Sequence, residues 1–202
     1  MSTAEQKGAT WRRNFLAAHA GEIWACDFFC VQTILFRTIY IFFILHHASR
    51  EVVHVRTTCH PTSEWTGRQI VEVCGWDREP PRFLIHDRDS RYGTAFDLRL
   101  KALGIRSVRT PFRSPQANAI AERWVKSIRT ECPDHLLILN ERHLRSVLTD
   151  VTWFNRWRPH RSLGQQAPRG HGPPARTTNW RGARIIALPV LGGLHHVYDL
   201  AA

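Results

Sequence analysis

Three acidic residues, Asp27, Asp87 and Glu122, occupy positions at which a carboxylate could do chemistry. Asp27 falls inside an apolar, strand-like run, where a charge is costly unless it is paired or bound to a metal ion. Asp87 follows a short apolar run typical of a buried strand, and open α/β sheets commonly bind ligands at such strand ends. Glu122 falls in the first turn of an expected helix, where the helix dipole favours a carboxylate in any case. Taken alone, Asp27 could equally lie at a solvated edge, and Glu122 could be an ordinary surface residue.

The expected helix from about 119 to 132 groups further charges beside Glu122. With about 100° of rotation per residue, Lys126 and Arg129 lie roughly 40° and 20° from Glu122, on the face opposite Trp124 and Ile128. A salt bridge within the helix would explain Glu122 and Lys126 and would stabilise the helix by roughly a few tenths of a kcal/mol. One face of the helix thus carries a carboxylate followed by two cations, and the other face is apolar.

Aromatic and β-branched residues predict the strands that must hold these acids. Three such runs follow one another at short spacing and predict an antiparallel meander over residues 23–31, 38–45 and 51–58. A capped helix after Pro61, a short buried strand at 83–86 and a further helix and strand continue the chain. Three strands followed by alternating helices and strands predict an α/β fold, a mixed sheet with helices on both faces.

The second half of the chain predicts helices and then a tail. Asn140 is placed to cap one last long helix, whose apolar positions run to Phe154. The following sequence is rich in Pro, Gly and Arg, which predicts an extended, basic tail. Its apolar run at 185–193 could add a strand or dock on a partner. We therefore expect a leader at 1–20, a core domain at 21–164 and the tail at 165–202.

Positive charge is concentrated in the second half. Residues 99–184 hold 17 Arg and Lys against 5 Asp and Glu, a net charge of +12, whereas the remainder holds 11 against 12. Of the 28 basic residues, 25 are Arg, whose planar fork suits bidentate contacts to phosphate. A GC-rich genome would explain Arg over Lys but not the uneven distribution. The pattern indicates nucleic acid as the partner rather than a merely solvated basic face.

Several other classes of protein do not fit the sequence. No apolar run approaches the ~20 residues needed to cross a bilayer, and the N-terminus lacks a secretory signal. We therefore expect a cytoplasmic, nucleoid-associated protein with no membrane partner. Five scattered cysteines without a CxxC pair indicate reduced thiols. The group His46, His47, Cys59 and His60 matches no usual zinc-site spacing.

Together, the residues resemble the DDE integrase and transposase superfamily, whose core has a ribonuclease-H-like fold. The family places one Asp in the middle of the first strand, as Asp27 stands in Trp-Ala-Cys-Asp. A second Asp follows the fourth strand, as Asp87 does in Ile-His-Asp-Arg-Asp-Ser-Arg-Tyr, and a Glu stands 35 positions further, as Glu122 does. Downstream, Phe154 opens a run similar to the Tyr-Asn-x-x-Arg-Pro-His-x-x-Leu signature of bacterial insertion-sequence transposases. The resemblance covers roughly residues 20–170.

The resemblance implies a metal-dependent polynucleotidyl transferase. Asp27 would bridge two Mg²⁺ or Mn²⁺ ions while Asp87 and Glu122 each complete one site, and these ions prefer carboxylate oxygens. The reaction would be DNA cleavage followed by strand transfer, in which a DNA 3′-hydroxyl attacks a target phosphate. The residues expected to contact DNA are Gln116, Asn118, Arg123, Lys126, Arg129, Arg156, Arg158, His160 and Arg161. The family further implies a homo-oligomer when DNA is bound.

Two departures from the family pattern keep alternatives open. Many relatives have Gly where Asp89 stands, although the 35-residue spacing favours Asp87 as the ligand. Only about 20 residues precede the first strand, too few for the helix-turn-helix that usually reads the element ends. Either the chain is a fragment, or it is the product of a separate reading frame with a helix-turn-helix protein encoded upstream. The alternatives are a catalytically idle or truncated DNA-binding remnant, and a ribonuclease-H-like nuclease that only hydrolyses.

Overall fold

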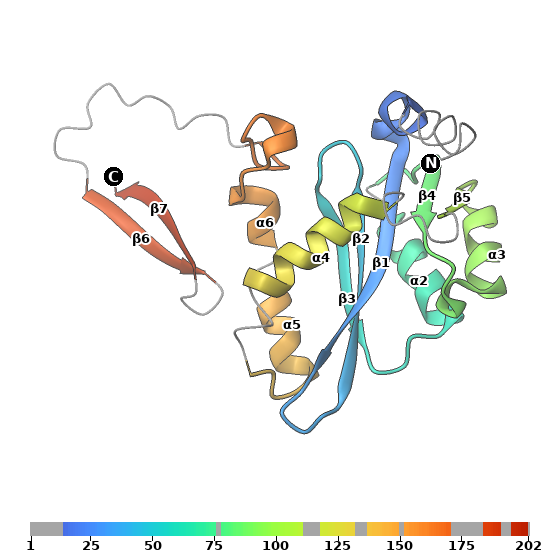
Figure 1. Cartoon of the computed structure of the whole chain (residues 1–202), viewed down its shortest axis with the longest axis horizontal. Helices are drawn as coiled ribbons and strands as arrows, with labels where there is room; N and C mark the ends of the chain where they lie inside the picture. Colours follow the sequence, from blue (N-terminus) through green and yellow to red (C-terminus); the bar gives the residue numbers. More distant parts are fainter. Residues whose placement is uncertain are drawn as a thin grey trace, which may run out of the picture.

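The computed structural model describes residues 14–75, 78–110, 118–131, 137–149, 152–170, 184–190 and 195–201. At its centre is a five-stranded mixed sheet with the strand order β3-β2-β1-β4-β5 (Figure 1). The strands are β1 (Ile23–Gln32), β2 (Thr38–His46), β3 (Val52–Thr58), β4 (Phe83–His86) and β5 (Arg106–Arg109). The first three are antiparallel, and β4 and β5 run parallel to β1.

The central part of β2 is buried on both faces, since the sheet lies between two layers of helices. Phe43 and Leu45 belong to the core on one face, whereas Phe42 and Ile44 belong to the core on the other. A continuous apolar run is what a strand covered on both sides requires. The predicted antiparallel meander and the mixed sheet with helices on both faces are therefore confirmed.

One face of the sheet is covered by α2 (Ser63–Val73) and α3 (Thr94–Ala102). Thr62 begins α2 as its N-cap, and its Oγ1 accepts the Trp65 backbone N–H at 3.2 Å. Ile70 of α2 and Phe96 of α3 are fully buried in this core. Two short 3-10 helices, η1 (Ala20–Glu22) and η2 (Ser90–Tyr92), precede β1 and α3.

The other face is covered by α4 (Ala119–Glu131) and α5 (Glu141–Thr149). The predicted apolar face of α4 is confirmed, because Trp124 and Ile128 are buried against the sheet. The predicted cap of α5 is confirmed as well, since Asn140 Oδ1 accepts the His143 backbone N–H at 2.9 Å.

The prediction of one last long helix is wrong, since α6 (Thr152–Trp157) is separate from α5 and is followed by the 3-10 turn η5 (Arg161–Leu163). Asn155 explains where α6 lies. Its buried side chain accepts the Val52 backbone N–H at 2.7 Å and donates to the Val52 carbonyl at 2.8 Å. The side chain thus satisfies the edge of β3 as a neighbouring strand would. Helical periodicity cannot reveal a bond to a residue 103 positions away.

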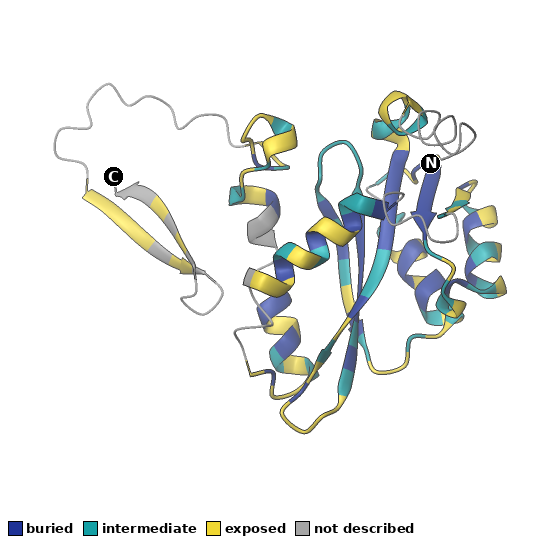
Figure 2. Ribbon diagram, viewed as in Figure 1, coloured by how far each residue is buried: buried dark blue, intermediate teal, exposed yellow. Residues whose placement is uncertain are grey.

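The last described residues form a second, two-stranded antiparallel sheet of β6 (Arg184–Val190) and β7 (His195–Ala201). Of the two alternatives for the apolar run beginning at Ile185, a strand or a docking segment, the structure shows a strand, and its partner β7 was not predicted. Figure 2 shows the contrast between this mostly exposed hairpin and the buried strands of the main sheet. Among the described helices, none has the length and apolar character needed to span a membrane.

Candidate active site

Asp27 lies in the middle of β1 and is partly buried among apolar neighbours such as Cys26 and Phe29. Its Oδ1 accepts the Phe28 backbone N–H at 2.7 Å. Burial raises the pKa of Asp27 to about 7; the Phe28 bond opposes this rise, and the neighbouring carboxylates of Asp87 and Glu122 add to it. At neutral pH the charged form of Asp27 is therefore costly until a cation approaches it.

Asp87 follows β4 at the level of Asp27. Ala25 of β1 pairs with Ile85 of β4 in a parallel ladder, so the same register continued by two residues sets Asp87 beside Asp27. Residues at equal positions of parallel neighbours share a face of the sheet. The Asp87 Oδ1 accepts the backbone N–H of Asp89 at 3.1 Å, which fixes the turn after the strand.

Glu122 reaches this region from α4, where its side chain is exposed in the first turn. Two side chains attach α4 to the β1 backbone on either side of Asp27. Asn118 donates to the Cys26 carbonyl at 3.4 Å, and Arg129 donates to the Cys30 carbonyl at 2.9 Å. This crossing brings Glu122 close enough to Asp27 to contribute to its raised pKa.

The three acids share one electrostatic environment without meeting around a single ion. In the part of the chain that the structure describes, no three His, Cys, Asp or Glu side chains are close enough to hold a metal ion together. The donor chemistry nevertheless suits a divalent cation, because the charged form of Asp27 is disfavoured by burial and by two further carboxylates. The ligand roles of Asp27, Asp87 and Glu122 remain predictions.

Arg91 is a cation of this region that the sequence analysis missed. Its guanidinium pairs with Asp89 at 2.5 Å and lies over the Phe28 ring, with Cζ 4.5 Å from the centroid. Arg91 holds the pKa of Asp89 below its ordinary value and acts in the same direction on Asp27. Since Asp89 is engaged by Arg91, Asp87 is the better candidate ligand. Arg91 stands four residues after Asp87, but its type alone gives no sign that it folds back over β1.

Two of the residues predicted to contact DNA are engaged within the protein. Asn118 is buried and bonds to Cys26, so it anchors α4 rather than facing outward. The Arg129 guanidinium is bonded to the β1 backbone, although the residue stays exposed. Helix periodicity placed Arg129 beside Glu122 correctly but could not show that β1 passes within hydrogen-bonding distance. Gln116 lies outside the described residues.

The other predicted contacts divide between two places. Arg123 and Lys126 are exposed on α4 next to Glu122, and Arg156 is exposed on α6. Arg158, His160 and Arg161 line a pocket of about 190 Å³ together with Arg123. This pocket also contains Arg50, which the sequence analysis did not select because it lies in the short connection between β2 and β3.

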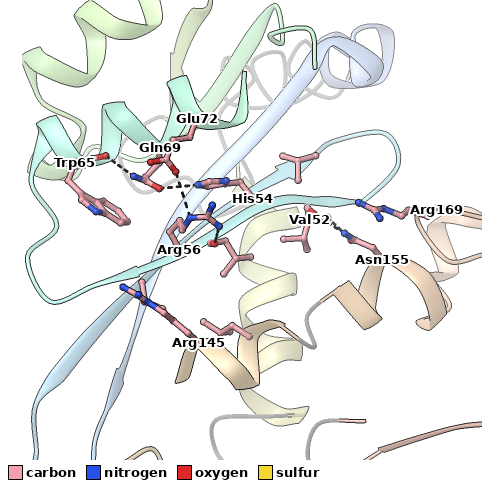
Figure 3. Close-up of a pocket in the computed structure, with 13 residues that line it drawn as sticks. Val52, His54, Arg56, Trp65, Gln69, Glu72, Arg145, Asn155 and Arg169 are labelled. Carbon is pink, nitrogen blue, oxygen red and sulfur yellow. Dashed lines mark hydrogen bonds and ion pairs between the residues drawn. The ribbon is translucent and has the colours of Figure 1, made fainter. Parts of the chain in front are cut away.

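A cavity of about 800 Å³ elsewhere in the structure is lined by none of the three candidate ligands. Figure 3 shows that it runs along β3 between α2 and the helices that follow α4. Its polar groups already have partners: His54 is bonded to Gln69 at 3.1 Å, and Arg56 lies 3.7 Å from Glu72. The three candidate carboxylates therefore lie outside this cavity.

Part of the chain is similar in sequence to known proteins. The model of the family described as "Integrase core domain" matches residues 103–168, which include Glu122 and the Arg-Pro-His segment. The chain is 32% identical over 75 residues to the protein named transposase InsD for insertion element IS2E, from Escherichia coli (strain K12). That alignment covers 34% of this chain and 32% of the relative, about a third of the relative's length.

Solved structures show the same fold at low sequence identity. One is a chain of the simian T-cell lymphotropic virus intasome in complex with PP2A regulatory subunit B56 gamma, with a TM-score of 0.61 and 14% identity over 85% of this chain and 64% of that chain. Another is the catalytic core domain of BIV integrase, with a TM-score of 0.50 and 16% identity over 74% of this chain and 91% of that chain. The fold is therefore the ribonuclease-H-like fold of integrase catalytic cores. In sequence, the similarity is to the integrase core domain over residues 103–168 and to a transposase over 75 residues.

Proposed function

We propose that this chain catalyses metal-dependent DNA strand cleavage and strand transfer, as the catalytic core of a transposase or integrase. The observation that carries the proposal is the position of Asp27 in the middle of β1, between the two β1 carbonyls to which Asn118 and Arg129 attach the helix of Glu122. Burial and the carboxylates of Asp87 and Glu122 raise the pKa of Asp27 to about 7, so acids from β1, from the turn after β4 and from α4 act on one another although they are far apart in the chain. Like charges held together in this way favour a bound cation.

Asp27, Asp87 and Glu122 would together hold two Mg²⁺ or Mn²⁺ ions. Their oxygens are the hard ligands that these ions prefer. When bound, such ions activate an attacking hydroxyl and stabilise the leaving oxygen of an in-line displacement. The part played by the protein is to hold the carboxylates on a rigid sheet and to orient the DNA end against them.

Basic residues next to the acids would supply the affinity for DNA. Arg123 and Lys126 are exposed on the same helix as Glu122 and would hold phosphates beside the reacting one. Gln116 would help to position the DNA end. Arg156 and the Arg158–Arg161 segment would contact the backbone, as the high positive charge of residues 99–184 favours. Such contacts carry no sequence information and weaken with salt.

The proposal includes partners that the catalytic core would need. Two DNA ends must be brought together for transposition, so a homo-oligomer is expected on DNA. Recognition of the ends would come from a helix-turn-helix protein encoded by an upstream frame. The protein would work in the cytoplasm, associated with the nucleoid.

A strand-transfer assay tests the proposal. The purified chain is incubated with Mg²⁺ or Mn²⁺, a duplex that carries the element's terminal sequence with a pre-cut 3′-hydroxyl, and a labelled target duplex. We expect joined products that require the metal ion and the 3′-hydroxyl, and that disappear with Asp27→Asn and Glu122→Gln. A 3′-dideoxy end is the matched control, because it blocks joining but leaves hydrolysis of the target possible.

The outcomes separate the proposal from its two alternatives. Metal-dependent cleavage without joining would identify a nuclease that only hydrolyses. Salt-sensitive DNA binding without any cleavage, in Mg²⁺ and in Mn²⁺, would identify a catalytically idle remnant.

A further inference from the structure

A second charged site lies against α4, beside the carboxylates but separate from them. It is a pocket of about 190 Å³ between the N-terminal half of α4, the turn after β2 and the Arg-Pro-His segment. Its apolar floor includes Leu45, Ile120 and Trp124. Its polar lining includes Arg50, Arg123, Arg158, His160, Arg161 and Ser162, and no acidic side chain lines it.

Arg50 holds an unusual position in this pocket. Its backbone has φ = 63°, in the left-handed region that is unfavourable for a residue with a long side chain. Its Nη1 donates to the His47 carbonyl at 2.6 Å, and its Nε donates to the Ser162 Oγ at 3.4 Å. These bonds connect the β2–β3 turn to the Arg-Pro-His segment, 112 residues away, and hold the guanidinium in the pocket.

Much of the positive charge in the pocket has no carboxylate against it among the described residues. Among the residues that the structure describes, no carboxylate forms an ion pair with Arg50, Arg123 or Arg161. Burial and the nearby Arg123 hold the pKa of Arg50 below its ordinary value. The pKa of His160 is also lowered, first by burial and then by Arg158 and Arg50. An anion in this pocket would relieve each of these repulsions.

We propose that this pocket is a binding site for a phosphate of the DNA backbone. Converging guanidinium groups suit a phosphate better than other anions, since each presents two parallel N–H donors to two oxygens. The pocket also offers other hydrogen-bond donors. Ser127 and Ser162 contribute hydroxyl groups, and the Trp124 Nε1–H has no acceptor among the described residues. The pocket offers what a phosphodiester needs and nothing that would read a base.

The pocket lies on the same helix as Glu122, which suggests a role for the bound phosphate. This role rests on the proposed function. Arg123 directly follows Glu122, so their side chains leave α4 about 100° apart. A strand whose phosphate sits in the pocket therefore passes close to Glu122. The pocket would fix the register of the DNA strand relative to the carboxylates, as a positioning site and not as a part of the chemistry.

The test uses Arg50→Asn in the full chain. Asn tolerates the left-handed region, so this variant removes the guanidinium while the turn keeps its conformation. DNA affinity is measured by fluorescence anisotropy over a range of salt concentrations, with a duplex and without metal ions. We expect about tenfold weaker binding, and a slope of log K against log salt that is smaller by about one. Arg68→Gln, which removes one exposed charge from α2 across the sheet, is the matched control and should leave the slope nearly unchanged.

A second variant and a second probe make the result decisive. Arg161→Gln changes an exposed residue and should reproduce the reduced slope. Inorganic phosphate should raise the thermal stability of the wild type more than that of Arg50→Asn. An unchanged slope for Arg161→Gln and Arg50→Asn would overturn the proposal, and so would protection by free phosphate without any effect on DNA binding. The assays contain no metal, so strand transfer can fail while the pocket binds DNA, and the reverse result is equally visible.

Discussion

Two clusters of like charge border α4, and they have opposite signs. On one side, Asp27 and Asp87 of the sheet lie near Glu122; on the other, Arg50 of the β2–β3 turn lies near Arg123. Other charges are paired within the protein, such as Arg109 with Asp97 and Arg169 with Glu51. Keeping like charges together is unfavourable for folding alone. The contrast is consistent with the two proposals made above, metal ions at the acidic cluster and phosphate at the basic one.

The two clusters also differ in how they are built. The acids stand on or beside strands of the central sheet, and Asp27 and Asp87 are set by the register of β1 and β4. The arginines come mainly from connections and from the segment after α6, which is held by Asn155. A metal site needs fixed geometry, whereas backbone phosphates tolerate adjustment, and the proposed roles of the two clusters fit this difference.

The largest expected effect separates two neighbouring acids. Asp87→Asn should lower the rate of metal-dependent cleavage by roughly a thousandfold, a typical loss when a charge-stabilising group is removed from an active site. Asp89→Asn should lower it less than about fivefold, because Asp89 is paired with Arg91. Single-turnover rates in Mn²⁺ measure both. Equal losses for the two variants would place Asp89 among the ligands and contradict the assignment.

The pH dependence of stability tests whether the acidic cluster is strained without metal. The pKa of Asp27 rises from an ordinary 3.8 to about 7 in the folded protein. Between these two pH values, Asp27 therefore keeps its proton in the folded state but has lost it in the unfolded state. In the presence of a chelator, the free energy of unfolding should fall as pH rises from about 4 to about 7, by at most about 4 kcal/mol.

Urea denaturation over this pH range measures the effect. Asp27→Asn should remove most of the slope and make the metal-free protein more stable at neutral pH. Mg²⁺ should restore stability to the wild type but not to this variant. A variant with the same pH slope as the wild type would show that Asp27 is not held in the unfavourable environment described above.

The basic cluster depends on the anchoring of α6. Asn155→Ala removes two buried hydrogen bonds and leaves the N–H and carbonyl of Val52 without their partner. We expect a loss of roughly 2–4 kcal/mol in the free energy of unfolding. Arg156→Ala, at the exposed neighbouring position, should change it by less than about 0.5 kcal/mol. Chemical denaturation compares the two variants. Equally small changes in their free energies of unfolding would show that Asn155 does not anchor α6.

The smallest effect is expected where charges are paired at the surface. Arg109→Gln breaks the ion pair with Asp97, in which both side chains are substantially exposed. Such pairs stabilise proteins by about 0–1 kcal/mol. Thermal denaturation should show little change, and the salt dependence of DNA binding should stay close to that of the wild type. A large change in either would mean that paired and unpaired arginines do not differ as proposed.

Much of the fold could be predicted because its signals are local. The apolar runs of β1 and β2, the Thr62 region that caps α2 and the apolar stripe of α4 each depend on residues close in sequence. The place of α6 against the edge of β3 could not be predicted, because the bond between Asn155 and Val52 joins residues far apart in the chain. A strand in the apolar run at 185–193 was one of the predicted alternatives, but its partner β7 was missed because the strand pattern of β7 is weak.

The candidate site shows the same division. Residue types and the 35-residue spacing singled out Asp27, Asp87 and Glu122 and favoured Asp87 over Asp89. The roles of Asn118 and Arg129 in holding α4 on β1 were invisible, because each bonds to a carbonyl more than 90 residues away. Arg50 was overlooked for the same reason, since its neighbours in sequence say nothing of Arg123 or Ser162.

The sequence by itself determined which side chains can bind metal ions or phosphate, because charge and donor type belong to the residue. It also determined the helices and strands of the core, because the spacing of apolar residues that predicts them depends only on residues close in sequence. Only the tertiary structure decided which charges are neutralised within the protein and which stay uncompensated, because Coulomb interactions depend on distance in space.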